Sequence, residues 1–214
     1  MIIGVTGNNG SGKDTFARYL VERKGFEHIS LSDFIREETA KRGIDLARNN
    51  FHEVANRMRE ERGAGILAKI ARERMVKGKN YVVTSIRNPG EIKALEESDD
   101  FVMVSVDAPI KIRFNRIMER NRKNEKELLS FEEFEKFEAD ELKSLSTSSQ
   151  QMKECIDMAR FKIDNSGSLE AFPKEIENTF SQVELYFKNN SNGKNRVNRR
   201  QWSWQNYLRG IFGK

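Results

Sequence analysis

The chain has 214 residues, 37% of them hydrophobic and 33% charged, and a formal net charge of +5. This length fits one domain with an inserted lid and can bury a substantial core. No apolar run approaches the ~20 residues of a membrane span and no basic-then-apolar signal segment opens the chain, so we expect a cytoplasmic protein without membrane contact. The single cysteine, Cys155, excludes an intramolecular disulfide and a cysteine-based zinc cluster, and we expect a buried structural thiol.

The first predicted elements are a short apolar strand, Ile2–Thr6, and a helix-compatible run from Thr15 to Arg23. The loop between them has the spacing G-x-x-x-x-G-K, and the order strand, loop, helix identifies a phosphate-binding P-loop. Its glycines permit tight, partly left-handed turns, so that backbone N–H groups converge on a phosphate at the positive end of a helix. The residues expected to bind ATP in this loop are Gly7, Asn8, Asn9, Gly10, Ser11, Gly12, Lys13, Asp14 and Thr15.

Two residues of the P-loop bear most directly on catalysis. Lys13 is a mobile cation for the terminal phosphates of the nucleotide, and we predict that it is catalytic. Asp14 stands where Ser or Thr normally reaches Mg²⁺. The alternative interpretation, a chance glycine-rich turn, is disfavoured because strand, loop and helix all line up.

Short apolar strands alternate with helices along the rest of the chain. This alternation predicts an α/β fold of three layers, in which a parallel five-stranded sheet lies between helices and its strands are buried on both faces. The further predicted strands are His28–Leu31, Tyr81–Thr84, Phe101–Val106 and Phe161–Ile163.

Two mostly helical regions interrupt this alternation. Residues 36–77 separate the second and third strands, and apolar residues recur in them at helical spacing, as in Phe51, Val54, Ala55 and Met58. Residues 121–149 form a charged excursion, in which the spacing of Phe131, Phe134 and Phe137 indicates a packed helix face more than a binding stripe.

Charged residues follow the second and third predicted strands. Asp33 and Arg36 follow the second strand, and Arg87 follows the third. Ligands of such sheets bind beyond the carboxyl ends of the strands, and guanidinium groups bind phosphates bidentately, so both arginines are candidates for an acceptor phosphate. Asp33 is a candidate for both catalysis and acceptor binding, since it could polarise an acceptor hydroxyl or hold a magnesium-bound water; the alternative is a helix cap. The alternative for each arginine is a surface salt bridge.

The fourth strand leads through Pro109 into a helix with several arginines. Arg116 and Arg120 are four residues apart and share one helical face. Mobile arginines neutralise the charge that phosphoryl transfer spreads over the equatorial oxygens, so we predict that both are catalytic. A solvated basic face is the alternative. The absence of an Asn/Thr-Lys-x-Asp segment argues against a GTPase.

In this order, the P-loop, Ser32-Asp33-x-x-Arg36, Ile86-Arg87 and Arg116-x-x-x-Arg120 resemble the nucleoside monophosphate kinase superfamily. The segment 161–169 is similar to dephospho-CoA kinases and archaeal adenylate-kinase-related proteins, which implies that Asn165 lies at the adenine-side turn. The resemblance covers about residues 1–185 and implies a kinase fold with acceptor-binding helices over 36–77 and a lid over 121–149. It also implies transfer from ATP, with Mg²⁺, to a (deoxy)nucleoside monophosphate or a similar phosphate-bearing molecule.

One residue departs from this pattern. Relatives usually carry an acid at the end of the third strand, where this chain has Thr84. The Gly-Lys-Asp-Thr form of the P-loop is similar to phage-type deoxynucleoside monophosphate kinases, so Asp14 and Thr15 are the expected magnesium ligands, and Asp14 or Asp33 would replace the missing acid. The stretch Ser-Ile-Arg-Asn-Pro-Gly-Glu also resembles the P-loop half of fused deoxycytidylate deaminases. A catalytically weak nucleotide-binding regulatory module with a deaminase-like partner is therefore a second hypothesis, and a dephospho-CoA kinase-like enzyme is another.

The basic excess of the chain lies in its last residues. Between 188 and 214 there are seven Lys and Arg and no acid, so removing these charges from the net +5 leaves about −2 for the predicted kinase domain, 1–187. We expect a linker from Lys188 and then a tail with Trp202 and Trp204. Nucleic-acid binding is not expected except weakly through this tail, and a homodimer stays open. His28 and His52 lack metal-ligand partners at useful spacing.

Overall fold

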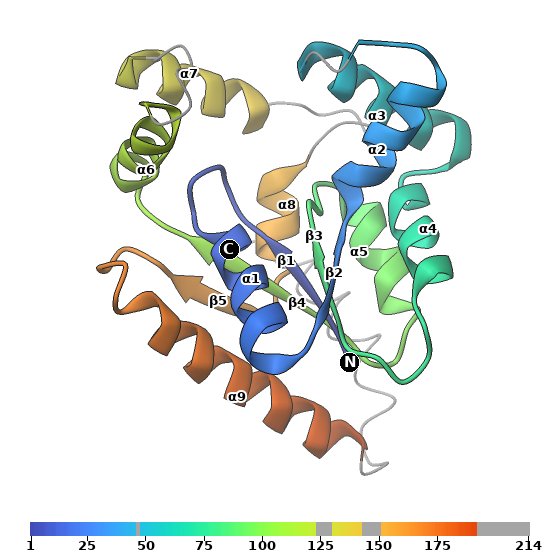
Figure 1. The fold of residues 1–214 in the computed structure, drawn as a ribbon, viewed down its shortest axis with the longest axis vertical. Helices are drawn as coiled ribbons and strands as arrows, with labels where there is room; N and C mark the ends of the chain where they lie inside the picture. Colours follow the sequence, from blue (N-terminus) through green and yellow to red (C-terminus); the bar gives the residue numbers. More distant parts are fainter. Residues whose placement is uncertain (46–47, 123–129, 143–150, 192–214) are drawn as a thin grey trace, which may run out of the picture.

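The computed structural model describes residues 1–45, 48–122, 130–142 and 151–191 (Figure 1). Its five strands form one parallel sheet in the order β2-β3-β1-β4-β5, as the alternation of elements predicts. The predicted three-layer α/β fold is confirmed. The strands are β1 Ile2–Thr6, β2 Glu27–Ser30, β3 Tyr81–Thr84, β4 Phe101–Asp107 and β5 Phe161–Asp164.

Helices cover both faces of the sheet (Figure 1). Successive residues of a strand point to opposite faces, so Val82 packs on one side and Val83 on the other. The side of Val82 is covered by α1 and α9, and the side of Val83 by α2 to α5 and α8. The helices are α1 Lys13–Lys24, α2 Leu31–Lys41, α3 Arg48–Arg62, α4 Ile66–Arg74, α5 Pro89–Glu96, α6 Ile110–Arg122, α7 Phe131–Leu142, α8 Met152–Asp157 and α9 Phe172–Ser191.

The two predicted helical regions are present. Helices α2, α3 and α4 account for 36–77, and Val54, Ala55 and Met58 of α3 are buried as predicted. In the second region, α7 packs on α6 through rings: the Phe114 centroid lies 5.4 Å from that of Phe131 and 5.7 Å from that of Phe134. The predicted packed face is therefore confirmed for these two phenylalanines. The side chain of Phe137 lies outside the described part, as do residues 123–129 and 143–150.

Three details of the prediction are wrong. All five strands were predicted to be buried on both faces, but of the described strands only β1, β3 and β4 are buried almost throughout, because β2 and β5 lie at the edges of the sheet. On β2, His28 is exposed. Leu31 begins α2 instead of ending β2. The segment from Lys188 to Ser191, expected to be part of a linker, is the last turn of α9. In this turn Asn190 Nδ2 donates to the Tyr186 carbonyl at 2.7 Å. Residues 192–214, with both tryptophans, lie outside the described residues.

Cys155 is fully buried in α8, as expected for a structural thiol. Within the described ranges, no helix has the length and apolar character needed to cross a membrane.

Candidate functional site

The P-loop joins the end of β1 to the first turn of α1, and its glycines are required by close packing. Gly7 and Gly12 have φ of 151° and 107°, in the left-handed region that favours glycine. A Cβ at Gly7 would overlap the carbonyl oxygen of Val106, and a Cβ at Gly12 would overlap the amide of Asn165. Side chains are therefore excluded at both positions, as the sequence predicts for a loop that turns its backbone toward a phosphate.

Lys13 and Asp14 are the first two residues of α1 and differ in exposure. The side chain of Lys13 is 11% exposed and that of Asp14 is 72% exposed, with 3.9 Å between Nζ and Oδ1. Thr15, the other predicted magnesium ligand, is also exposed. Lys13 thus lies within the protein at the positive end of a helix, whereas the carboxylate and the hydroxyl face outward. The buried position of Lys13 suits a cation that contacts phosphates. The exposed positions of Asp14 and Thr15 suit oxygen ligands that reach a solvated metal.

Asn165, predicted on the adenine side, follows β5 and is buried against the P-loop. Its Nδ2 donates to the Ser11 carbonyl at 2.8 Å, and its own carbonyl accepts from Nη2 of Arg116 at 2.9 Å. The structure therefore brings together three predicted residues from the loop, the end of β5 and α6. Arg120 lies one turn further along α6 and is exposed.

Two of these residues keep polar atoms without partners. In the part of the chain that the structure describes, Ser11 Oγ and Arg116 Nη1 are the buried side-chain nitrogen and oxygen atoms that lack a hydrogen-bond partner. Burial also lowers the pKa of Arg116 from its usual value. Unsatisfied buried polar groups are rare in native proteins and call for a ligand or a water. A nucleotide phosphate at the P-loop fits this pair of donors.

Arg113, one turn before Arg116, was not among the residues predicted from the sequence. Arg113 is buried, and its Nε donates to the Ala108 carbonyl at 2.8 Å and its Nη1 to the Asn9 carbonyl of the P-loop at 3.3 Å. The same guanidinium forms a two-pronged ion pair with Glu138 of α7, with Nη2 to Oε2 at 2.7 Å. The backbone of Gly10 also lies against Arg113. Arg113 therefore joins the P-loop to α7, which lies in the region predicted as a lid.

Asp33 and Arg36 form an ion pair on the first turns of α2, beyond the end of β2. Both side chains are more than half exposed, at 57% and 58%. The Arg36 guanidinium also lies 5.6 Å from the ring centre of Phe51 on α3. Asp33 and Arg36, both predicted to lie on the acceptor side, are therefore in direct contact with each other.

Arg87 lies in the loop between β3 and α5 and is half-buried. Ser85, two residues before it, has φ of 62°, a left-handed conformation that is uncommon outside glycine and tends to occur at functional sites. Ser85 also forms a cluster of hydroxyls with Ser30 and Ser32 from β2 and α2, with oxygen–oxygen distances of 2.8, 3.1 and 3.4 Å. No spacing in the sequence pointed to this cluster, because its members come from separate segments.

Thr84, where an acid was expected, is buried and shares a hydrogen bond of 2.8 Å with Nε2 of His28. Among the described residues, no group of three or more His, Cys, Asp or Glu side chains lies in reach of one metal ion. Mg²⁺ in nucleotide sites is held by substrate phosphates, waters and one or two carboxylates, so this finding is compatible with metal that enters with the nucleotide. Asp14 and Thr15 stay the predicted oxygen donors for such a metal.

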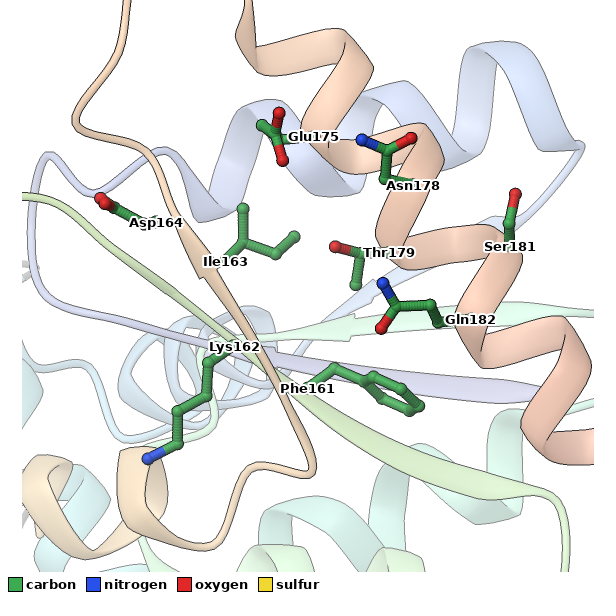
Figure 2. Close-up of a pocket in the computed structure, with 9 residues that line it drawn as sticks. All are labelled: Phe161, Lys162, Ile163, Asp164, Glu175, Asn178, Thr179, Ser181 and Gln182. Carbon is green, nitrogen blue, oxygen red and sulfur yellow. The ribbon is translucent and has the colours of Figure 1, made fainter.

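A separate pocket of about 440 Å³ lies between β5 and α9 (Figure 2). Ile163 and Thr179 lie between strand and helix, whereas Lys162 extends away from the helix (Figure 2). Its lining contains no residue of the P-loop and none of the acceptor-side residues Asp33, Arg36 and Arg87. The phosphate site is thus distinct from this pocket.

Comparison with known proteins places the chain in a family. A family model described as an AAA domain matches residues 6–135. A UPF0200 protein from Aeropyrum pernix is 35% identical over 173 residues, which is 79% of this chain and 87% of that protein. The chain belongs to the UPF0200 family.

Solved structures with the same architecture support a P-loop kinase fold for this UPF0200 chain. A crystal structure of a protein from Thermus thermophilus has a TM-score of 0.56 at 23% identity and covers 87% of this chain and 97% of that one. A gluconokinase from Sinorhizobium meliloti has a TM-score of 0.52 at 16% identity, with 87% and 95% covered. At these identities the likeness shows the fold.

Proposed function

We propose that this UPF0200 protein is an ATP- and Mg²⁺-dependent kinase that phosphorylates a nucleoside or deoxynucleoside monophosphate, or a similar phosphate-bearing molecule. The observation that carries the proposal is the arrangement of cations beyond three neighbouring strands. Lys13 and the P-loop follow β1, and Arg36 and Arg87 follow β2 and β3, in the strand order β2-β3-β1. A nucleotide hydrolase needs only Lys13 and the P-loop. A kinase for a phosphorylated acceptor needs, in addition, cations such as Arg36 and Arg87 that bind the acceptor phosphate.

On the donor side, the P-loop backbone would hold the β- and γ-phosphates. Lys13 and Arg116 would neutralise the charge on the transferred group, and Arg120 extends the same face of α6. Asp14 and Thr15 would hold Mg²⁺, which when bound neutralises phosphate charge. Asn165 would keep Ser11 and Arg116 in register with the loop through its two hydrogen bonds.

On the acceptor side, Arg36 and Arg87 would bind the phosphate that receives the transferred group. Asp33 pairs with Arg36, and an incoming phosphate would compete for the guanidinium through stronger bidentate bonds. When the accepting atom is a phosphate oxygen, no general base is needed and positioning dominates the catalysis. The role of Asp33 would then be to orient Arg36 before the acceptor phosphate takes its place.

The test is ADP release by the full chain at saturating ATP and Mg²⁺, with a panel of ribonucleoside and deoxynucleoside monophosphates and dephospho-CoA. We expect one or a few acceptors to raise ADP release far above the rate with ATP alone. Substitution K13M should abolish this stimulation, and R36A and R87A should raise the KM for the acceptor. An absence of stimulation by every acceptor would contradict the proposal, and a response to dephospho-CoA alone would identify a dephospho-CoA kinase-like enzyme.

A second candidate function is a nucleotide-binding regulatory module with weak or no catalysis. The observation that favours it is the pairing of Thr84 with His28 at the end of β3, where kinases of this type usually carry an acid. Calorimetry discriminates the two candidates: tight (deoxy)nucleotide binding without turnover supports the module. A deaminase-like partner, a homodimer, weak nucleic-acid binding by the tail and a cytoplasmic location stay predictions.

A further inference from the structure

An ion pair between Arg59 of α3 and Glu91 of α5 is buried within the acceptor side of the fold. Their side chains are 1% and 0% exposed. Arg59 Nε and Nη2 both donate to Glu91 Oε1, at 3.1 and 2.9 Å, and Nη1 donates to Asn56 Oδ1 at 3.4 Å. One carboxylate oxygen of Glu91 is therefore engaged by the guanidinium.

The other carboxylate oxygen of Glu91 holds the backbone of the arginine loop. Oε2 accepts from the N–H of Arg87 at 2.9 Å and from the N–H of Asn88 at 3.1 Å. The Asn88 side chain in turn accepts from the N–H of Gly90 at 2.8 Å, and Asn88 and Glu91 together form a capping box at the start of α5. Glu91 thus connects the guanidinium of Arg59 directly to the backbone of Arg87.

Two carbonyl groups of this loop are held by residues from other parts of the chain. The hydroxyl of Thr6, at the end of β1, donates to the Ile86 carbonyl at 3.0 Å. The N–H of Gln151, just before α8, donates to the Arg87 carbonyl at 2.7 Å. Both backbone groups of Arg87 are therefore hydrogen-bonded, and its side chain extends from a fixed point.

Stability alone is a weak reason for such a pair. Removing two charges from water carries a large desolvation cost, and apolar residues of similar size often stabilise a protein equally well. Apolar side chains, however, cannot accept the two N–H groups of Arg87 and Asn88. The pair also crosses between α3, in the predicted acceptor-binding region, and the loop that carries a predicted acceptor-binding arginine.

We propose that Arg59 and Glu91 are positioning residues that fix the backbone of Arg87 for acceptor binding; the catalytic part of this inference rests on the proposed function. Arg59 orients the Glu91 carboxylate, and Glu91 holds Arg87 and Asn88. Helix α3 is thereby connected to the loop that carries Arg87.

Hydrogen–deuterium exchange of the full chain tests the structural part without any substrate. The variants are E91Q, R59M, and the double variant R59M/E91Q, which leaves no unpaired buried charge and is expected to fold. In the folded double variant we expect amides of 86–91 to exchange about tenfold faster than in the wild type, because the neutral amide that replaces the carboxylate is no longer held by a guanidinium. Amides of β1 should exchange as in the wild type.

R72M is the matched control. Arg72 of α4 pairs with Glu97 and donates to the Ala94 carbonyl at 3.0 Å, so it also joins a helix of the acceptor side to α5, but no hydrogen bond connects it to the backbone of Arg87. R72M should leave the exchange of 86–91 unchanged. Wild-type exchange at 86–91 in a folded R59M/E91Q variant would overturn the proposal.

A kinetic measurement tests the consequence for binding. With the best acceptor of the panel, R59M/E91Q should raise the KM for the acceptor about tenfold and leave the KM for ATP unchanged, as expected for misplaced Arg87. Unchanged acceptor KM despite faster loop exchange would overturn the positioning role. If no acceptor is phosphorylated, the proposed function fails, while the exchange experiment still decides whether the pair fixes the loop.

Discussion

Lys13 and Asp14 are adjacent at the start of α1, yet their surroundings separate their chemistry. The Lys13 side chain is enclosed, so its charge would act on a bound phosphate through little water, which strengthens such an interaction. The Asp14 carboxylate is exposed and lies outside the loop's packing, so a metal can reach it together with its waters. With Thr84 paired to His28, Asp14 is the carboxylate of the P-loop on which metal binding can depend.

Substitution D14S tests this dependence. Loss of the carboxylate should raise the Mg²⁺ concentration for half-maximal ADP release about tenfold, because a charged oxygen ligand is replaced by a neutral one. The measurement is a Mg²⁺ titration at fixed ATP, with D33N as the control for a carboxylate on the acceptor side. Unchanged Mg²⁺ dependence in D14S would show that Asp14 does not compensate for Thr84.

Cys155 provides a prediction about pH. Burial, together with the nearby charges of Glu91 and Glu154, raises the pKa of the thiol well above its usual value. The reactive thiolate is therefore scarce at pH 8 and increases only at higher pH. We expect iodoacetamide to modify Cys155 slowly at pH 8 in the native protein and rapidly in 6 M guanidinium chloride; fast labelling of the native protein would contradict the buried thiol.

At the scale of secondary-structure elements, α6 is the link between the P-loop and α7. Its Arg113 bonds the Asn9 carbonyl on one side and Glu138 on the other, and the two ionised side chains are 6% and 11% exposed. Because a buried charge without a partner is costly, this contact holds α7 against α6. The same contact keeps Arg116, one turn on, beside Asn165.

Substitution R113M should therefore lower the free energy of unfolding by about 3 kcal/mol, since it leaves Glu138 buried without its partner. Urea denaturation measures the change. The control is K153M, which breaks an exposed ion pair with Asp157 within α8 and should change the free energy by less than about 0.5 kcal/mol. Equal effects of the two substitutions would mean that the Arg113 pair carries no special weight.

At the scale of the whole molecule, the sheet brings the predicted donor-side and acceptor-side residues to the carboxyl ends of its strands. The helices α2 to α4 lie on one side of these strand ends and α6 and α7 on the other (Figure 1). Parallel strands place all of their carboxyl ends together, so groups from β1, β2, β3 and β4 converge although they are far apart in the sequence.

A ligand that binds this native arrangement should stabilise the whole domain. At a concentration of ADP 100 times its Kd, the free energy of unfolding should increase by about 2.7 kcal/mol, which raises the Tm by several degrees. Thermal unfolding with and without ADP and Mg²⁺ measures this shift, and K13M is expected to lose it. A wild-type Tm that does not respond to ADP would argue against nucleotide binding at the P-loop.

Most of the fold was predictable because its signals are local. Each buried central strand is a continuous apolar run, each helix repeats its apolar residues every three or four positions, and the P-loop occupies a few consecutive residues. The edge strands were harder, because burial depends on which strand has a neighbour. Asn88-Pro-Gly-Glu91 is a capping-box signal, with proline at the first helical position, that could have pointed to Glu91.

The sequence by itself determined the phosphate-binding loop and the list of candidate arginines, since each depends on spacing within one short segment. It also determined the parallel sheet, since strands and helices alternate along the chain. Only the tertiary structure showed the polar pairs that surround those arginines: Arg59 meets Glu91 across 32 positions, Arg113 meets Glu138 across 25, and Asn165 meets Ser11 across 154. A sequence pattern does not show which acidic residue pairs with a given arginine. Their partners are set by the packing of helices on the sheet, which brings remote segments into contact and excludes water from between them.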